Sequence, residues 1–439
     1  MTKLPIWKPP TLLLVVGALL FYAVLYLLRL DTTGGAPGDL RGFHLPSIQI
    51  YRDNPFITAM QEQYSAMGPL YYAVFSQFAV EEQGVTFFSA LAHCTGFVIL
   101  LVAHTLRWRR HFGNRSVPQI NITLYFGLVT CVFLLNSFIV GPAIWGNPEG
   151  LAFLFMSLSV LCIVLARGRI ALTIVAGLCF ALLVLTRQSH FSMISLLWLL
   201  IAADQRGLSW PVMVRIIVFS VPCMLAGVFL VSVWSGLTPP RFAHHAGISI
   251  FNVFIPVSYV GIVALITVFL SFGIWLVGRA FFGFEVSAET DRRWKASTLI
   301  CGPINPLTFI LSCTAFAAAC RFAVMSSLPP SMGGGIVVKL LPVLGNNGFV
   351  FVATVGFAFV LRYCSANLLF VFGFVVFLST FSMTGDIYYQ RYFDPYLAMF
   401  FTLGVFSHNF LADRRAIFPL IALTLYFLGL LAFSVVYYA

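Results

Sequence analysis

Residues 31–82 read DTTGGAPGDLRGFHLPSIQIYRDNPFITAMQEQYSAMGPLYYAVFSQFAVEE and form a polar stretch between two apolar runs. The flanking runs, residues 11–30 and 85–105, are each long enough to cross a bilayer as a helix. Charged groups are costly next to lipid, so a loop this rich in them predicts a function at the membrane surface. Six of the 14 acidic residues of the chain lie in it: Asp31, Asp39, Asp53, Glu62, Glu81 and Glu82.

The composition of the whole chain is that of an integral membrane protein. Of its 439 residues, 60% are hydrophobic and only 9% are charged, whereas soluble domains carry about 25% charged residues. The repeated apolar runs predict an all-α polytopic membrane protein with about 13 transmembrane helices. The expected spans are residues 11–30, 85–105, 121–140, 150–166, 170–186, 190–203, 211–235, 253–276, 298–319, 348–361, 366–383, 397–411 and 416–437.

We expect a single integral membrane domain over residues 1–439. Residues 31–84 would be its large first extracytoplasmic loop, with interfacial helices. Within that loop, residues 69–79 (PLYYAVFSQFA) are apolar but too short to span a bilayer. They predict an interfacial or re-entrant helix, because the segment is rich in Tyr and Phe.

The basic residues predict the orientation of the chain in the membrane. With the N-terminus in the cytoplasm, 17 of the 25 Lys and Arg residues fall in cytoplasmic segments and 8 on the other face. The net charge of +11 is therefore a topology signal, and we expect no nucleic-acid partner. The predicted location is the endoplasmic reticulum membrane or a bacterial inner membrane, with the site on the luminal or periplasmic face.

Cysteine and histidine give no sign of a metal or redox centre. Nearly all of the 9 cysteines fall inside apolar runs and none forms a CxxC pair, so we interpret them as core residues. The adjacent His244 and His245 lack a nearby acidic residue, so they do not predict a metal site. We expect no cofactor.

The mixed charges on the predicted extracytoplasmic face indicate a polar site, and the groups collected there fit the needs of one reaction, sugar transfer from a lipid phosphate. This reaction needs a carboxylate that takes the proton of the acceptor hydroxyl. It also needs cations or amide donors that hold the phosphate. The first loop offers Asp39 and Asp53 as bases. The candidate phosphate partners are Arg187, Arg241, Arg321, Lys339 and Arg391.

Five short motifs in this chain follow one another in an order found in a known family. They are Phe43-His44-x-Pro46-x-x-Gln49-x-Tyr51, MGPLY at residues 67–71, Pro148-Glu149-Gly150, Arg187-Gln188-Ser189, and Arg391-Tyr392-Phe393 followed by Pro395-Tyr396. The series resembles the dolichyl-phosphate-glucose α-1,2-glucosyltransferase family. Two features depart from the family pattern. Asp39 stands alone where the family has an Asp-Glu pair just before Phe-His, and the WDPxITTPPG run is not intact.

The resemblance implies the C-type glycosyltransferase fold (GT-C) and metal-independent transfer with inversion. It implies glucose as the sugar, a polyprenyl or dolichyl monophosphate donor, and a lipid-linked or envelope glycan as acceptor. The family's carboxylates correspond to Asp39 and Glu149, with Asp53 as a further candidate base. The expected substrate-binding residues are His44, Gln49, Tyr71, Arg187, Gln188, Arg241, Arg391 and Tyr392.

Each of these residues also has a structural interpretation. Asp39 and Asp53 would then be solvated loop acids or helix caps, and His44 a packing residue. Glu149 would favour a helix N-terminus electrostatically. Arg187 would form a structural pair with an acid, and Arg391 would extend to the interface.

Two other functions remain open from the sequence. One is a transporter or flippase of a lipid-linked sugar, which typically shows inverted repeats and charges near the bilayer midplane. No repeat is apparent here. The other is a polysaccharide polymerase or ligase, which would use a diphosphate donor.

Overall fold

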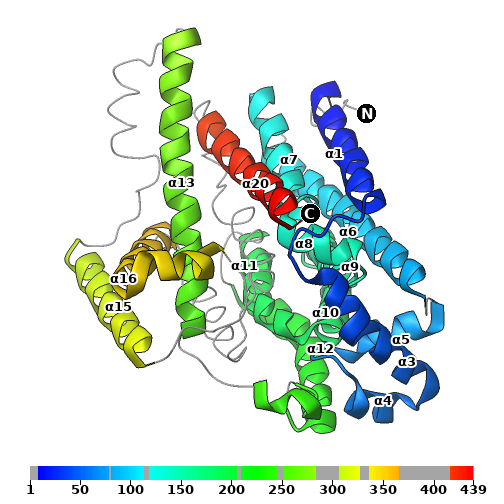
Figure 1. Cartoon of the computed structure of the whole chain (residues 1–439). Coiled ribbons are helices and arrows are strands. Elements are labelled where there is room, and N and C mark those ends of the chain that lie inside the picture. Colours follow the sequence, from blue (N-terminus) through cyan, green and yellow to red (C-terminus); the bar gives the residue numbers. More distant parts are fainter. Residues whose placement is uncertain are drawn as a thin grey trace. The chain divides into compact units, whose positions relative to one another are not determined.

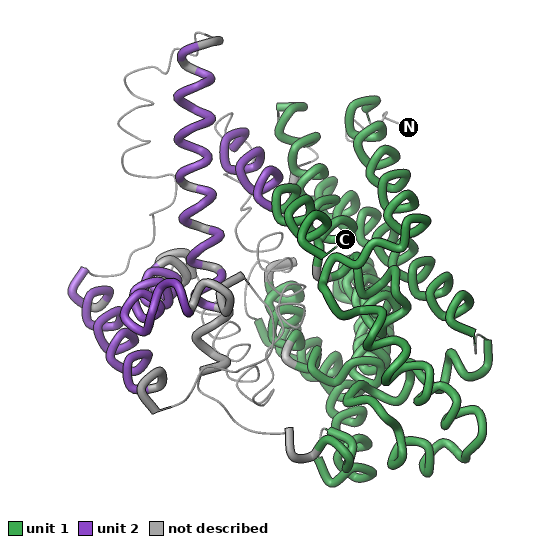
Figure 2. The backbone as a smooth tube through the Cα atoms, viewed as in Figure 1, with its two compact units in different colours: residues 1–246, 427–439 green, residues 247–426 purple. Residues whose placement is uncertain are grey.

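The computed structural model describes residues 8–78, 81–112, 118–204, 209–236, 238–245, 251–282, 306–326, 336–364 and 416–438. Every regular element in these ranges is a helix (Figure 1). The predicted all-α class is therefore confirmed for the described part of the chain. The chain divides into two compact units (Figure 2). Unit 1 contains Met1–Ala246 and Phe427–Ala439, and unit 2 contains Gly247–Tyr426.

Six described helices are long and apolar enough to cross a membrane, which supports the predicted integral membrane character. They are Pro9–Leu27, Glu82–Arg110, Glu149–Ala166, Trp210–Trp234, Val257–Gly278 and Ile417–Tyr438. Five shorter apolar helices accompany them. The total of 13 spans stays a prediction, because residues 366–383 and 397–411 lie outside the described ranges.

Unit 1 contains the first loop and the helices on which that loop packs. The helices of the first loop are short: α2 (Ala36–Asp39), a π-helical turn (Leu40–His44), α3 (Leu45–Asp53), α4 (Phe56–Glu62) and α5 (Pro69–Phe78). The others are α1 (Pro9–Leu27), α6 (Glu82–Phe112), α7 (Gln119–Phe133), α8 (Ser137–Ile144), α9 (Glu149–Ala166), α10 (Ile170–Thr186), a 3-10 helix (Gln188–Met193), α11 (Ile194–Asp204), α12 (Trp210–Trp234) and a second 3-10 helix (Pro240–His245).

Helices α9 and α10 form a tight antiparallel hairpin. The connection is short because Arg167 and Gly168 both adopt left-handed backbone conformations, with φ of 43° and 91°. The two helices have nearly equal lengths, 18 and 17 residues, so the start of α9 lies beside the end of α10. Helix α6 packs on α9, and α12 packs on α10.

Glycine permits the close approach of α6 to α9. A Cβ atom on Gly150 would collide with the carbonyl oxygen of Ser89, and a Cβ on Gly96 would lie 2.9 Å from the Phe153 ring. Helices inside a bilayer gain little from the hydrophobic effect, so their association depends on such backbone contacts. The order of the contacts along the chain shows that α6 and α9 run in the same direction.

The predicted span at residues 121–140 is two helices rather than one. Helix α7 ends at Phe133 and α8 begins at Ser137. The carbonyl group of Phe133 accepts a hydrogen bond from His93 Nε2 at 2.9 Å, and the carbonyl of Ser137 accepts one from the Thr32 hydroxyl. His93 thus satisfies a carbonyl group at the end of α7 that the break leaves without a helical partner.

Unit 2 contains α13 (Phe251–Phe282), α15 (Pro306–Ser326) and α16 (Ile336–Cys364). Helices α13 and α16 approach closely at Gly261 and Gly356, where a Cβ on either residue would collide with the other helix. The rings of Phe316 and Phe357 stack with centroids 4.1 Å apart and join α15 to α16. Helix α20 (Ile417–Tyr438) is the last helix in the described part of the chain.

The close contact at Gly150 generates a stability prediction. Gly150→Ala should lower the melting temperature of the detergent-purified protein, because the added methyl group meets backbone and costs about 1–3 kcal/mol. Gly17→Ala is the matched control, since a Cβ there has no atom within 4 Å. A helical Gly→Ala change at such a position is neutral or stabilising. Equal melting temperatures for the two variants would contradict the close packing of α6 on α9.

Candidate functional site

A buried ion pair joins the start of α9 to the end of α10. Arg187 Nη1 donates to Glu149 Oε1 at 2.5 Å, and the two side chains are 1% and 5% exposed. The hairpin dictates this meeting, because Glu149 is the first residue of α9 and Arg187 follows the last residue of α10. The pairing is the structural interpretation that the sequence left open for Arg187.

Both charges sit where the helix dipoles favour them. An anion is stabilised at a helix N-terminus and a cation at a C-terminus. Even so, removing two charges from water is costly, and their attraction offsets that cost only when the geometry is good. A pair this buried is therefore sensitive to the loss of either partner.

The first loop packs on the same helix ends. The Gly68 amide donates to the Thr186 carbonyl at 3.2 Å, and Gln188 Nε2 donates to the carbonyl of Ala66. The hydroxyl of Tyr71 donates to the Gly146 carbonyl, just before α9. The loop is thus fixed to the start of α9 and to the end of α10, the two helix ends that carry the ion pair.

A second contact fixes the loop to α12. The indole of Trp234, the last residue of α12, donates to the Met60 carbonyl on α4 at 2.9 Å. These helix ends all fall on the face that the sequence analysis assigns to the extracytoplasmic side. That assignment itself stays a prediction.

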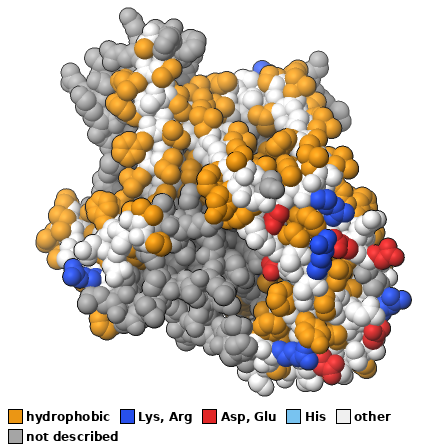
Figure 3. All heavy atoms as spheres, viewed as in Figure 1, with side chains coloured by type: hydrophobic (Ala, Val, Ile, Leu, Met, Phe, Trp, Pro, Cys, Tyr) orange, Lys and Arg blue, Asp and Glu red, His pale blue; other side chains and the backbone are white. Residues whose placement is uncertain are grey.

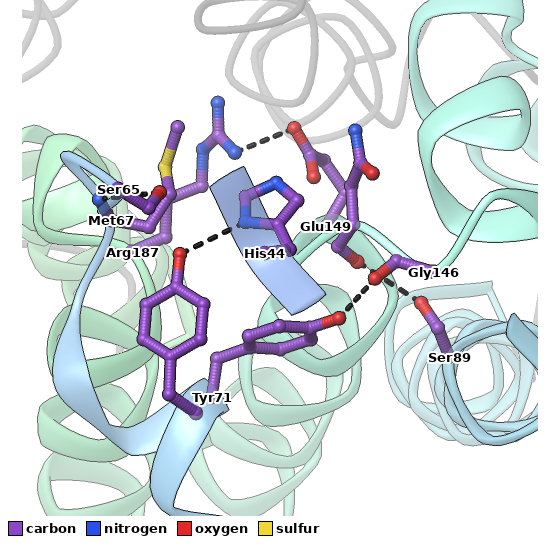
Figure 4. Close-up of polar contacts among 10 residues, drawn as sticks. His44, Ser65, Met67, Tyr71, Ser89, Gly146, Glu149 and Arg187 are labelled. Carbon is purple, nitrogen blue, oxygen red and sulfur yellow. Dashed lines mark hydrogen bonds and ion pairs between the residues drawn. The ribbon is translucent and has the colours of Figure 1, made fainter. Parts of the chain in front are cut away.

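His44 lies at the centre of the polar group around the ion pair (Figure 4). Its Nδ1 atom is 2.9 Å from the hydroxyl of Tyr72, and its ring packs edge-on against Tyr71. Burial raises the pKa of the Tyr72 phenol. The phenol therefore stays neutral, and the direction of its hydrogen bond with Nδ1 depends on the tautomer of the imidazole ring.

Asp39 lies near this polar group. Burial raises the pKa of Tyr72, the charge of Arg187 lowers it, and the charges of Glu149 and Asp39 add to the rise. Asp39 is half-buried and makes no capping hydrogen bond to the π-helical turn that follows. That turn, Leu40–His44, buries both Leu40 and His44 and so fixes the segment that carries Asp39. π-Helical turns often occur at functional sites.

Other predicted residues lie apart from this group or outside the described ranges. Asp53 and Gln49 are exposed on α3 and bond to each other at 2.7 Å. The guanidinium of Arg241 stacks 4.4 Å from the centre of the Tyr64 ring. Arg321 is exposed on α15 in unit 2. Arg391 and Tyr392 lie outside the described residues, as does the side chain of Lys339.

Charged side chains gather on the face of unit 1 formed by the first loop (Figure 3). Arg41 and Glu82 form a bidentate salt bridge there: Nε and Nη2 of Arg41 donate to the carboxylate at 3.0 and 2.9 Å. The Arg41 side chain is 62% exposed, so this pair contributes far less than the buried one.

Sequence reasoning missed Tyr72, Asn147 and Ser89. Tyr72 positions His44, and the Ser89 hydroxyl on α6 donates to the Asn147 carbonyl at 3.0 Å. Tyr72 directly follows a predicted site residue in a Tyr-Tyr pair, which was a usable signal. Asn147 had a weaker one, as the polar residue of a Gly-Asn-Pro turn before α9.

No protein-family model matches the chain, and comparison with curated proteins and with solved structures finds no match either. The chemistry of the site therefore has to come from its residues. Within the described ranges, no group of three or more His, Cys, Asp or Glu side chains is arranged to hold a metal ion. The site offers a half-buried carboxylate, a buried imidazole and a buried guanidinium.

The buried pair generates a second prediction. Arg187→Gln should lower the free energy of unfolding by about 3–5 kcal/mol, because Glu149 would remain buried without its counter-charge. Glu149→Gln should have a similar effect. The double variant should be less destabilised than the sum of the two, as measured by thermal unfolding in one detergent.

The exposed pair of Arg41 and Glu82 supplies the control for this double-mutant cycle. Arg41→Gln should change the melting temperature little, since both partners remain hydrated. Strict additivity of the Glu149 and Arg187 effects would show that the two side chains do not interact.

The contact of Tyr72 with His44 generates a third prediction. Tyr72→Phe removes the hydroxyl that bonds to the buried Nδ1 of His44 and should lower the free energy of unfolding by about 1–3 kcal/mol. Amide hydrogen exchange in residues 36–44 should become faster. Tyr64→Phe is the control, because that phenol ring is 46% exposed. Unchanged exchange in the Tyr72 variant would argue against a role for this contact in fixing the Asp39 segment.

Proposed function

We propose that the protein is an inverting membrane glycosyltransferase. It transfers a hexose, by resemblance glucose, from a polyprenyl or dolichyl monophosphate. The acceptor is a hydroxyl of a lipid-linked or envelope glycan on the luminal or periplasmic face. One arrangement supports this proposal: the turn that follows Asp39 contacts Tyr72 through His44, within a loop that packs on the apolar helix ends carrying the buried Glu149–Arg187 pair.

In the proposed reaction, Asp39 acts as the general base. It takes the proton of the acceptor hydroxyl while the hydroxyl oxygen bonds to the anomeric carbon. The bond from that carbon to the phosphate oxygen breaks on the opposite face of the sugar. The electron pair leaves with the lipid phosphate, so the configuration inverts.

Asp39 fits the role of base better than the other acids. Asp53 is exposed and bound by Gln49, which keeps it on the outer face of α3. Glu149 is engaged by Arg187 at 2.5 Å, so it is better suited to hold the guanidinium than to accept a proton. We assign the contact between Arg187 and Glu149 Oε1 to positioning the loop and its charges.

The lipid phosphate needs a cation during the reaction. Arg391 is assigned to it by resemblance, with Tyr392 beside it in the sequence. Arg241 is a second candidate, because its guanidinium is exposed while it stacks on Tyr64. An aromatic face stabilises a guanidinium without occupying its N–H groups.

A transporter or flippase of a lipid-linked sugar is the second candidate function. The break between α7 and α8 and the buried ion pair favour it, since transporters use broken helices and paired charges at membrane depth. It differs from the enzyme in needing no general base. The role of Asp39 therefore separates the two functions.

The fourth prediction concerns transfer of radiolabel in membranes from polyprenyl-phosphate glucose. Asp39→Asn should lower the rate at least 100-fold, the usual scale for loss of a general base. Asp53→Asn is the matched control and should stay close to wild type at equal expression. Both changes keep the shape of the side chain and remove one charge from the same loop.

The outcomes distinguish the candidates. Wild-type transfer that survives Asp39→Asn and fails in Asp53→Asn would move the base to Asp53. No wild-type transfer from glucose or mannose monophosphate donors would overturn the proposal and favour the transporter. Transfer only from a diphosphate donor would indicate a polymerase or ligase.

A further inference from the structure

Three side-chain oxygens near the ion pair are buried without a hydrogen-bond partner in the described part of the chain. They are Glu149 Oε2, Asn147 Oδ1 and Gln188 Oε1. Asn147 is 1% exposed and Glu149 is 5% exposed. A buried acceptor without a donor is costly, so such a group calls for a ligand or another explanation.

The three residues belong to two adjoining segments. Asn147 lies two residues before Glu149, and Gln188 directly follows Arg187. The ion pair therefore brings both segments together. Backbone hydrogen bonds hold Asn147 in place. Its backbone N–H donates to the Pro142 carbonyl at 2.8 Å, and its backbone carbonyl accepts from the Ser89 hydroxyl. The amide nitrogen of Gln188 is fixed on Ala66. The acceptors thus lie on an ordered framework.

The chemistry of these groups favours one kind of ligand. Three acceptors repel a phosphate, and the guanidinium already beside Glu149 disfavours a metal cation. One water has two hydrogens for three oxygens. A sugar presents several O–H donors on one rigid ring.

We infer that Asn147, Glu149 and Gln188 bind hydroxyl groups of the hexose on the lipid donor. This inference rests on the proposed function only for the statement that the sugar is a donor substrate. The site takes the sugar ring, whereas the phosphate is held by cations elsewhere. The structure thereby assigns sugar recognition to the turn before α9 and to the end of α10.

The first test uses the wild-type protein and needs no variant. Rates of transfer are compared for polyprenyl-phosphate glucose and for donors whose glucose lacks one hydroxyl at position 2, 3, 4 or 6. Sites that hydrogen-bond a hydroxyl discriminate strongly against its absence. We expect at least one deoxy donor to lose about tenfold or more in kcat/KM. Equal kcat/KM for all of them would overturn the inference.

The second test asks whether Asn147 provides the discrimination. Asn147→Leu keeps the approximate shape and removes the acceptor. It should lower kcat/KM for the glucose donor about tenfold and leave the sensitive deoxy donor nearly unchanged. A purely structural effect of the substitution would lower kcat/KM alike for the glucose donor and for the deoxy donor. Gln77→Leu, on the exposed face of α5, is the control and should change neither value.

A binding measurement separates this inference from the proposed function. Purified protein is heated with citronellyl-phosphate glucose or with citronellyl phosphate. We expect the glucose compound to raise the melting temperature more, and Asn147→Leu to abolish the difference. Sugar-dependent stabilisation without transfer would refute the enzyme and keep the sugar site. Transfer without sugar-dependent stabilisation or deoxy discrimination would keep the enzyme and refute the site.

Discussion

The buried contact of Glu149 with Arg187 is the interaction on which the rest of unit 1 depends. It satisfies two charges that the interior would not tolerate singly, and it fixes the register of the α9–α10 hairpin at one end. Because helix dipoles favour both charges, the pair forms where the two helices meet most easily. The loop contacts at Thr186, Gly146 and Gln188 all lie within a few residues of it.

This arrangement explains how a long polar loop becomes ordered beside a membrane. Short helices satisfy most backbone groups locally, and side chains such as Tyr71 and Trp234 bond to the carbonyl groups that remain. The π-helical turn then buries His44, whose contact with Tyr72 fixes the segment that carries Asp39. In the proposed enzyme, the base comes from the loop and the sugar contacts come from the helix ends.

Much of the fold could be predicted from apolar runs. The spans at 11–30, 85–105, 150–166, 170–186 and 211–235 correspond to described helices, and the short helix expected at 69–79 is α5. The break between α7 and α8 could not be predicted, because it depends on His93 and Thr32, which lie distant in sequence. The partner of Arg187 was equally hidden, since only the hairpin selects Glu149. Asp53 and Gln49 lie four residues apart on a helix, so their mutual bond was within reach of sequence reasoning.

A structure by electron cryomicroscopy with a short-chain lipid-phosphate glucose donor and an acceptor tests the central claim most directly. The account predicts the glucose ring against Asn147 and Glu149, and the Asp39 carboxylate within about 2.6–3.2 Å of the acceptor hydroxyl. A donor bound at the opposite ends of α9 and α10, beside Arg167 and Arg169, would contradict it. So would a sugar bound with Asp39 facing away from both substrates.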